Sequence, residues 1–211
     1  MLPIKRMKMK KLFMLTIGVV MAGAVSAQSF GVKGGANFAN MIKSGDSDFS
    51  TESNTGFNAG LFVEIPIVGG LSFAPELMFS QKGYKTSGTS LLGGANEYSV
   101  TTNFIELPVL AKINATNKFS IVAGPQVSFL TSTTEKFTTG SDSYQNTIRE
   151  ENDNLRKSIF GGVAGIGLGI TDKIGLHGRY SIDFQKNNGD GTNETPEYKN
   201  QVYQVSLAFK L

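Results

Sequence analysis

Hydrophobic and polar residues alternate with a period of two along most of the chain, and this alternation constrains the fold more than any other feature. Eight segments carry it, at residues 29–39, 56–66, 71–84, 99–113, 118–131, 158–170, 173–184 and 201–211. No segment after residue 28 has a convincing apolar stripe with a period of 3.6 residues, so we expect strands and no core helix. Each segment is longer than the about 5 to 6 residues of a typical globular strand. Such lengths suit the roughly 9 to 11 residues that a tilted strand needs to cross a bilayer.

The connections between these segments alternate between short and long. Short breaks lie at residues 67–70, 114–117 and 171–172, whereas long polar connections lie at 40–55, 85–98, 132–157 and 185–200. Short turns and long loops therefore fall at opposite ends of an up-and-down meander. Eight strands that close into a ring leave no unpaired backbone edge in lipid. We expect residues 28–211 to form an all-β domain, an eight-stranded antiparallel up-and-down transmembrane β-barrel.

Residues 1–27 have the pattern of a secretory signal peptide. Five basic residues lie between Lys5 and Lys11 without any Asp or Glu in this segment, and an apolar stretch at 12–25 and small residues before Gln28 follow. The chain has 20 Lys and Arg and 17 Asp and Glu; 15 basic residues remain outside this segment, so the formal charge falls from +3 to −2. The exported chain therefore lacks the clustered basic surface that nucleic acids require. It also has no cysteine for a disulfide or a thiolate site.

The central question is which face of the strands points inward. A soluble ligand-binding barrel places the apolar face inside, and a membrane barrel places it outside. Glycines lie on the polar face, where they suit the crowded interior of a small barrel: Gly31, Gly35, Gly60, Gly124, Gly161, Gly165, Gly167, Gly169 and Gly175. Aromatic residues lie near both ends of the apolar face, as in interfacial girdles. These are Phe38, Phe57, Phe79, Phe129, Phe160, Phe184 and Tyr203 toward the long loops, and Phe30, Phe73, Phe119 and Phe209 toward the short turns. We therefore favour the membrane barrel, with the soluble periplasmic barrel as an alternative.

This orientation predicts a polar network inside the barrel. Its members are Lys33, Glu64, Glu76, Lys82, Glu106, Lys112, His177, Arg179, Asp183 and Lys210. Four acidic and five basic groups nearly cancel, and because an isolated buried charge costs several kcal/mol, they must pair or meet water. An eight-stranded barrel is just wide enough to be filled by side chains, so we expect a plug. The alternative is a narrow water or ion path lined by Arg179 and the glutamates.

Other chemistry has weak support in the sequence. Ser120, Ser128 and Ser181 could approach His177, but Asp183 lies roughly 20 Å from it along the strand, so we expect no enzyme. Glycines 161–169 lack the third glycine and the following helix of a nucleotide loop. The acidic segment 187–197 and the pair Asp46 and Asp48 could hold Ca²⁺, but neither has the spacing of a calcium loop. We expect no metal and no cofactor.

Several segments resemble a known family. They are FGVKGGANFANM at 30–41, FAPELMFSQKG at 73–83, NFIELPVLAKI at 103–113, AGPQVSFL at 123–130 and GRYSIDF at 178–184. Together these are similar to the small Bacteroidetes-type outer-membrane barrels labelled PorT family or outer membrane protein beta-barrel domain. The resemblance implies an eight-stranded barrel in the outer membrane, and some relatives are linked to protein secretion or gliding machinery. The end at Phe209-Lys210-Leu211 departs from the final aromatic residue common in such barrels.

The sequence thus predicts an integral protein of the cell outer membrane. We expect a structural or interaction component that acts through its external loops on a rigid barrel, with an association with protein secretion as one option. The loop at 132–157 is the longest and could bind a protein partner. We expect a monomer surrounded by outer-membrane lipid. A pore for small solutes or ions is the first alternative function.

Overall fold

The structure is a computed structural model, and it describes residues 28–43, 52–89, 95–139, 142–148, 155–188 and 197–211. These residues contain nine strands: β1 (Ser29–Lys43), β2 (Glu52–Val68), β3 (Leu71–Thr89), β4 (Ala95–Asn114), β5 (Phe119–Thr139), β6 (Asp142–Ile148), β7 (Ser158–Gly169), β8 (Ile174–Asp183) and β9 (Tyr198–Lys210). The expected signal peptide lies outside the described residues, as do Asp46, Asp48 and most of segment 187–197. No helix within the described ranges is long and apolar enough to cross a membrane.

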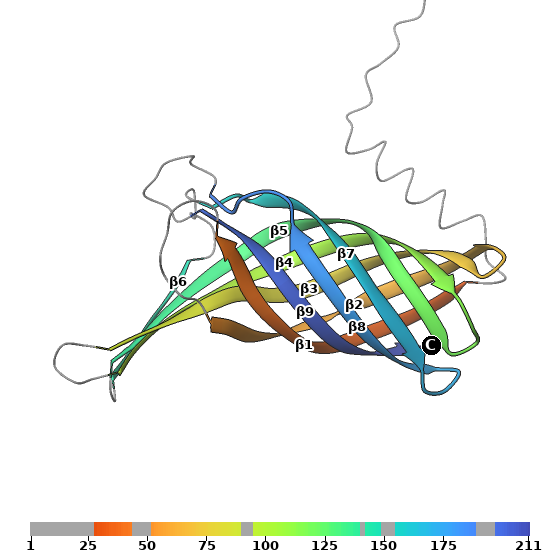
Figure 1. Cartoon of the computed structure of the whole chain (residues 1–211), viewed down its shortest axis with the longest axis horizontal. Helices are drawn as coiled ribbons and strands as arrows, with labels where there is room; N and C mark the ends of the chain where they lie inside the picture. The colour runs from red at the N-terminus through yellow and green to blue at the C-terminus, as the bar shows by residue number, and fades with distance from the viewer. Residues whose placement is uncertain (1–27, 44–51, 90–94, 140–141, 149–154, 189–196) are drawn as a thin grey trace, which may run out of the picture.

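Eight of the strands form a closed antiparallel ring (Figure 1). Neighbours follow chain order from β1 to β5 and from β7 to β9, β5 pairs with β7, and β9 pairs with β1. Strand β6 pairs with the far end of β5 and stands outside the ring. The predicted eight-stranded up-and-down barrel is therefore confirmed, with one additional strand.

The short turns lie together at one end of the barrel, on the right in Figure 1, and we call it the turn end. The β2–β3 turn contains Gly69 and Gly70, whose φ angles of 53° and 82° favour glycine. The other two turns share a local pattern. In each, a threonine Oγ1 accepts hydrogen bonds from two backbone N–H groups further along: Thr116 from Lys118 and Phe119, and Thr171 from Lys173 and Ile174. These hydroxyls accept hydrogen bonds from backbone N–H groups that have no strand partner in the turn, so the two threonines stabilise the turns.

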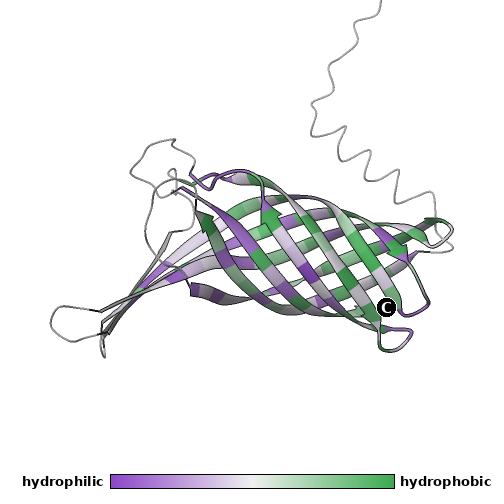
Figure 2. Cartoon of the chain, viewed as in Figure 1, coloured by the Kyte–Doolittle hydropathy of each residue, from purple (hydrophilic) through white to green (hydrophobic). Residues whose placement is uncertain are grey.

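At the opposite end, which we call the loop end, the strands are longer than expected. Strand β3 continues to Thr89 and β4 begins at Ala95, although residues 85–98 were expected to form a loop. Strand β5 continues to Thr139 and forms a hairpin with β6, so residues 132–157 are not one irregular loop as we expected. The extension projects beyond the ring and is largely hydrophilic (Figure 2). Its many threonines and serines carry no apolar alternation, which explains why its strands escape a search for that pattern.

The outer wall carries the apolar side chains. Leu61, Leu77 and Leu207 are 56%, 48% and 55% exposed, and hydrophobic positions recur along the strands between the two ends (Figure 2). Three aromatic pairs lie on this wall, with ring centroids 5.1 to 5.8 Å apart: Phe57 with Phe79, Phe160 with Phe184, and Tyr180 with Tyr203. A soluble barrel would turn these side chains inward, so the soluble ligand-binding alternative is wrong.

Interior glycines allow adjacent strands and side chains to approach closely. A Cβ atom added at Gly35 would overlap the carbonyl oxygen of Val205 on β9. One added at Gly124 would overlap the carbonyl oxygen of Val109 on β4. Because these neighbours are backbone atoms, side-chain rotation cannot relieve the overlap. Gly35 and Gly124 are therefore required by the close approach of neighbouring strands in the narrow ring.

Candidate functional site: the polar interior and the two ends of the barrel

Charged side chains inside the barrel form three triads. The outer triad, nearest the loop end, consists of Lys82, Glu106 and Asp183, with Lys82 Nζ 3.0 Å from Glu106 Oε1 and 2.9 Å from Asp183 Oδ1. All three side chains are at most 2% exposed. Two carboxylates share one ammonium, so the outer triad has a formal charge of −1. Lys82 also lies over the ring of Phe104, 4.9 Å from its centroid.

The middle triad has the opposite charge. Both guanidinium Nη atoms of Arg179 donate to Glu76 at 2.6 Å, and Lys33 Nζ donates to the same carboxylate at 2.7 Å. These side chains are at most 4% exposed. The paired, bidentate geometry is the strong form of an ion pair. Two cations on one carboxylate give this triad a formal charge of +1.

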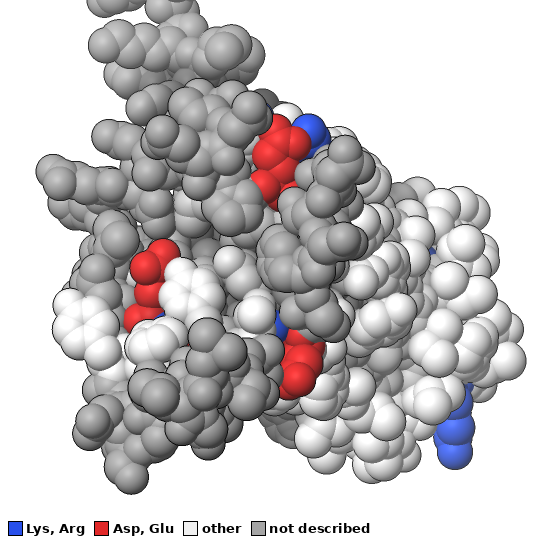
Figure 3. Space-filling model, turned by 60° about the vertical axis from the view of Figure 1, so that its left-hand side comes forward, with Lys and Arg blue, Asp and Glu red and all other residues white. Residues whose placement is uncertain are grey.

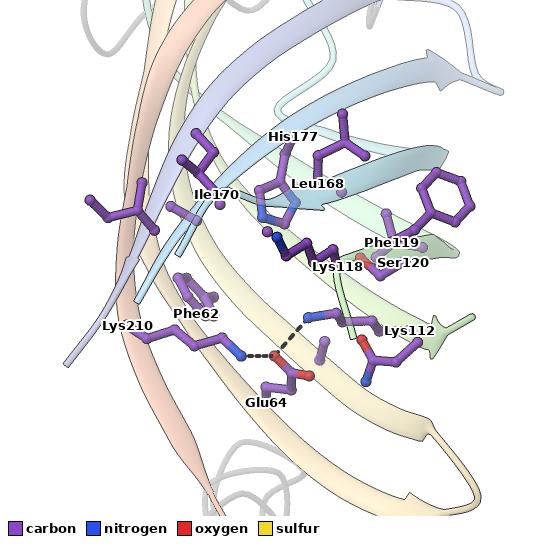
Figure 4. A pocket seen from close by; sticks show the side chains of 18 of the residues that line it. Phe62, Glu64, Lys112, Lys118, Phe119, Ser120, Leu168, Ile170, His177 and Lys210 are labelled. Atoms are coloured by element: carbon purple, nitrogen blue, oxygen red, sulfur yellow. Dashed lines mark hydrogen bonds and ion pairs between the residues drawn. The ribbon is translucent and has the colours of Figure 1, made fainter. Parts of the chain in front are cut away.

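The rim triad lies at the turn end. Glu64 Oε2 is 2.8 Å from Lys112 Nζ and 3.3 Å from Lys210 Nζ (Figure 4). The Lys210 side chain is 37% exposed, so this triad meets bulk water, whereas the side chains of the other two triads are at most 4% exposed. The structure thus brings nine of the ten candidate interior residues into three ion-pair groups, at successive levels of the barrel.

Neutral side chains complete the outer triad and fill the space between triads. Gln126 and Ser128 donate to Glu106, and Asn200 donates to Asp183 at 2.8 Å. Between the outer and middle triads, hydrogen bonds link four buried residues in a chain, namely Asn37, Asn58, Ser80 and Ser206. The sequence analysis missed these neutral partners, although they share the period and the face of the charged residues. These partners could have been predicted from asparagine and glutamine residues that lie on the inward face of the same strands as the charged residues.

His177, the tenth candidate, belongs to no ion-pair group among the described residues. Its Nδ1 is buried without a hydrogen-bond partner, and Ser120 on β5 lies across Gly167 from it. Asp183 is held by Lys82 and Asn200 in the outer triad, and Ser128 donates to Glu106 there. Ser120 and His177 therefore lie at the same level, but Asp183 lies in the outer triad, so Ser120, His177 and Asp183 are not assembled as a catalytic group. Among the described residues, no group of three or more His, Asp or Glu could hold a metal ion.

The interior is closed toward the loop end and open toward the turn end. An apolar cap of Met41, Tyr84, Val100 and Tyr198 lies above the outer triad, with the rings of Tyr84 and Tyr198 edge to face at 5.4 Å. At the turn end lies a cavity of about 450 Å³, which we call the vestibule (Figure 4). Its lining includes the rim triad, the middle triad and His177. In the part of the chain that the structure describes, the interior is therefore a cavity that opens at the turn end, without a continuous channel to the loop end.

The loop end presents an ordered surface. Tyr98, Phe137 and Tyr144 are cross-strand neighbours on β4, β5 and β6, and they continue the face of the apolar cap onto the extension. Phe137 is 46% exposed and Tyr144 73%. Carboxylates appear at separate points of this end (Figure 3). Glu197 precedes β9 at this end of the barrel, and a hydrogen bond from the Lys186 ammonium lowers the pKa of its carboxyl.

The fold and the interior together define a class of protein. A closed antiparallel barrel with an apolar outer wall, a polar interior, short turns at one end and long connections at the other is the architecture of small outer-membrane barrels. The chain belongs to the outer membrane protein beta-barrel domain family, whose model matches residues 26–188. This confirms the general family, and the family places the protein in the outer membrane.

One solved structure shows the same fold at low sequence identity, and two others are more weakly similar to the chain. Neisserial surface protein A is 13% identical, with a TM-score of 0.52 over 88% of this chain and 100% of that one. Ail of Yersinia pestis, solved in complex with the heparin analogue sucrose octasulfate, is 10% identical, with a TM-score of 0.48 over 87% and 99% of the two chains. OprG of Pseudomonas aeruginosa is 11% identical, with a TM-score of 0.39 over 88% and 96%. No curated protein matches the sequence significantly.

Proposed function

We propose that this protein is a monomeric structural and interaction component of the outer membrane, exported through residues 1–27, whose function resides in its loop end. The observation that carries the proposal is the contrast between the interior and the loop end. The interior is occupied by triads, hydrogen-bonded amides and the apolar cap, whereas Phe137 and Tyr144 stand exposed on an ordered extension. Aromatic side chains with this exposure are typical anchors of protein interfaces.

The partner that we propose is a protein that binds the extension formed by β4, β5 and β6. Aromatic residues on three neighbouring strands give a rigid surface that loses little conformational entropy on binding. The resemblance of segments 30–41 and 103–113 to the PorT family supports a secretion-associated assembly as the setting. The separation of His177 from Asp183, together with the use of Glu64 and Glu76 in ion pairs, supports a role without catalysis. The lipid of the outer membrane covers the apolar wall.

Site-specific photo-crosslinking tests this proposal. A photoreactive amino acid at position 144 should yield a defined adduct in native envelopes, and the double substitution of Phe137 and Tyr144 by Ala should abolish partner capture by the purified barrel. The matched control is Lys136→Ala, because Lys136 neighbours Phe137 on β5 but points to the opposite face of the strand. Equal capture by the double variant and the control would refute the proposal.

A small pore is the second candidate function, and the vestibule is the observation that favours it. The middle triad, the outer triad and the apolar cap stand between the vestibule and the loop end, so a path would require rearrangement of all three. Planar-bilayer recordings of the purified full chain separate the candidates. Reproducible unitary conductance steps would support the pore and count against the plugged barrel.

A further inference from the structure

The vestibule carries an excess of positive charge. Five of its lining residues direct a cationic group toward it, namely Lys33, Lys112, Lys118, Arg179 and Lys210, and three carry a carboxylate, namely Glu64, Glu76 and Asp172. Lys173 also borders the cavity, but its ammonium lies over the ring of Phe209 on the outer wall. Glu64 and Glu76 are each already shared between two cations at 2.6 to 3.3 Å. The rim triad and the middle triad therefore each leave one positive charge uncompensated. In a cleft with low-dielectric walls, such a charge raises the local concentration of anions.

The sign of this charge is specific to the turn end. The outer triad, with one lysine and two carboxylates, has the opposite formal charge. The cationic excess is thus not a general property of the plug but is confined to the part that opens into the vestibule. Buried charges need partners, and a ligand of opposite charge supplies one.

Two buried polar atoms in the vestibule lining lack partners. Arg179 Nε donates to no acceptor, although its side chain is only 4% exposed and both Nη atoms are used by Glu76. His177 Nδ1 is buried and unpartnered as well. Buried polar atoms without a partner are rare in proteins. Both atoms are enclosed by protein, so they mark a shortage of acceptors around Arg179 beside the vestibule, and they are not themselves contacts for a ligand.

The two threonine-capped turns provide a comparison between equivalent lysines. Lys118 and Lys173 each follow the capping threonine by two residues. Lys118 extends into the opening near His177 (Figure 4). Lys173 Nζ instead lies over the ring of Phe209, 5.8 Å from its centroid, and Phe209 belongs to the outer wall. The chain therefore places one turn lysine at the mouth of the vestibule and directs the ammonium of the other away from it.

We propose that the vestibule binds a small multivalent oxyanion, carrying phosphate or carboxylate groups, that enters from the turn end. A cavity of about 450 Å³ lies within the range of small-molecule sites. The short turns of such barrels face the periplasm, so the ligand comes from that compartment. The middle triad and the apolar cap close the far side, so the site captures the anion and does not pass it on.

Calorimetric titration of the full-length barrel in neutral detergent tests the proposal. The probes are pyrophosphate and citrate, with glycerol as the uncharged control. We expect saturable binding of at least one anion, weakened by added salt, and no binding of glycerol. Lys118→Gln should weaken binding about tenfold, because a cation at a partly desolvated site contributes on the order of one tenfold step in affinity. Lys173→Gln, which removes the same charge from the equivalent turn, should change it less than about twofold.

The comparison of the two lysine variants decides the outcome. Both residues lie in exposed turns, and a heat-dependent gel shift verifies that each variant forms the closed barrel. Absence of saturable binding of both anions would overturn the proposal, and so would equal losses in the two variants, which would indicate nonspecific attraction to surface charge. A preference for pyrophosphate would identify a phosphate ligand, and a preference for citrate a carboxylate ligand. Because crosslinking at position 144 reports on the opposite end, this result is independent of the proposed protein partner.

Discussion

Replacement of Lys82 by Met should strongly destabilise the barrel. Lys82 is fully buried and neutralises two carboxylates at once, Glu106 at 3.0 Å and Asp183 at 2.9 Å. Met keeps most of the side-chain volume but leaves both carboxylates buried without a cation. Removal of one partner from a buried ion pair costs about 3 to 5 kcal/mol. Two carboxylates lose their cation, but the hydrogen bonds that Gln126 and Asn200 donate to them remain. We therefore expect the free energy of unfolding to fall by an amount within that range and not by twice as much.

Lys85→Met is the matched control. Lys85 also lies on β3 and pairs with a carboxylate, Glu97, at 3.2 Å, but the two side chains are 36% and 48% exposed. An exposed ion pair contributes about 0 to 1 kcal/mol, so the same chemical change should have little effect there. A third variant, with Lys82→Met, Glu106→Gln and Asp183→Asn, should recover most of the lost stability because it removes the unpaired charges.

Equilibrium unfolding by urea in lipid vesicles, followed by far-ultraviolet circular dichroism and by gel mobility without boiling, measures these differences. The reasoning requires that Lys82→Met lower the free energy of unfolding by at least about 2 kcal/mol more than Lys85→Met. If the two variants lose the same amount, or if the triple variant is no more stable than Lys82→Met, the outer triad is hydrated and the interior is not the dry plug that its contacts describe.

Four further outcomes follow from the structure. Gly124→Val should prevent formation of the heat-modifiable closed barrel, because its Cβ overlaps the backbone of β4, and normal yields of closed barrel would contradict this. Leu61→Arg should cost about 2 to 4 kcal/mol in vesicle unfolding if this side chain faces the middle of the bilayer, whereas Leu61→Phe should be nearly neutral. The double substitution of Phe137 and Tyr144 by Ala should leave the unfolding free energy within about 1 kcal/mol of the parent chain, since both side chains are largely exposed. The purified chain should give no unitary current steps in planar bilayers, because the triads and the apolar cap close the far side of the vestibule.

The alternation of residue types predicts the ring and the direction of its side chains. Successive residues of a strand point to opposite faces, so Lys33, Glu76 and Arg179 could be assigned to one interior from the sequence alone. The sequence does not predict which of them meet. Lys82 and Asp183 lie 101 positions apart, and their contact depends on the tilt and stagger of the strands between them.

The loop end was harder to predict, for two physical reasons. A hydrophilic hairpin in water has no buried face, so β6 carries no alternation to detect. In addition, β5 has an extra residue near Thr131, where the register with β4 shifts between Asn103 and Phe104. A bulge of this kind reverses the alternation beyond it. Without the bulge, Phe137 would face outward like Phe129, because both have odd numbers. With the bulge between them, Phe137 lies on the same face of β5 as the buried Thr133.

The seam between β1 and β9 governs how this barrel can be assembled. The first strand to be synthesised pairs with the last, over Gly31–Lys210 at one end and Lys43–Tyr198 at the other. Until the C-terminal strand arrives, β1 has an unsatisfied backbone edge that hydrocarbon cannot solvate. A chain shortened within 198–210 would therefore not be a slightly weaker barrel but an unsealed sheet. Insertion into the membrane has to coincide with closure, or the open edge has to be shielded by another protein until closure is complete.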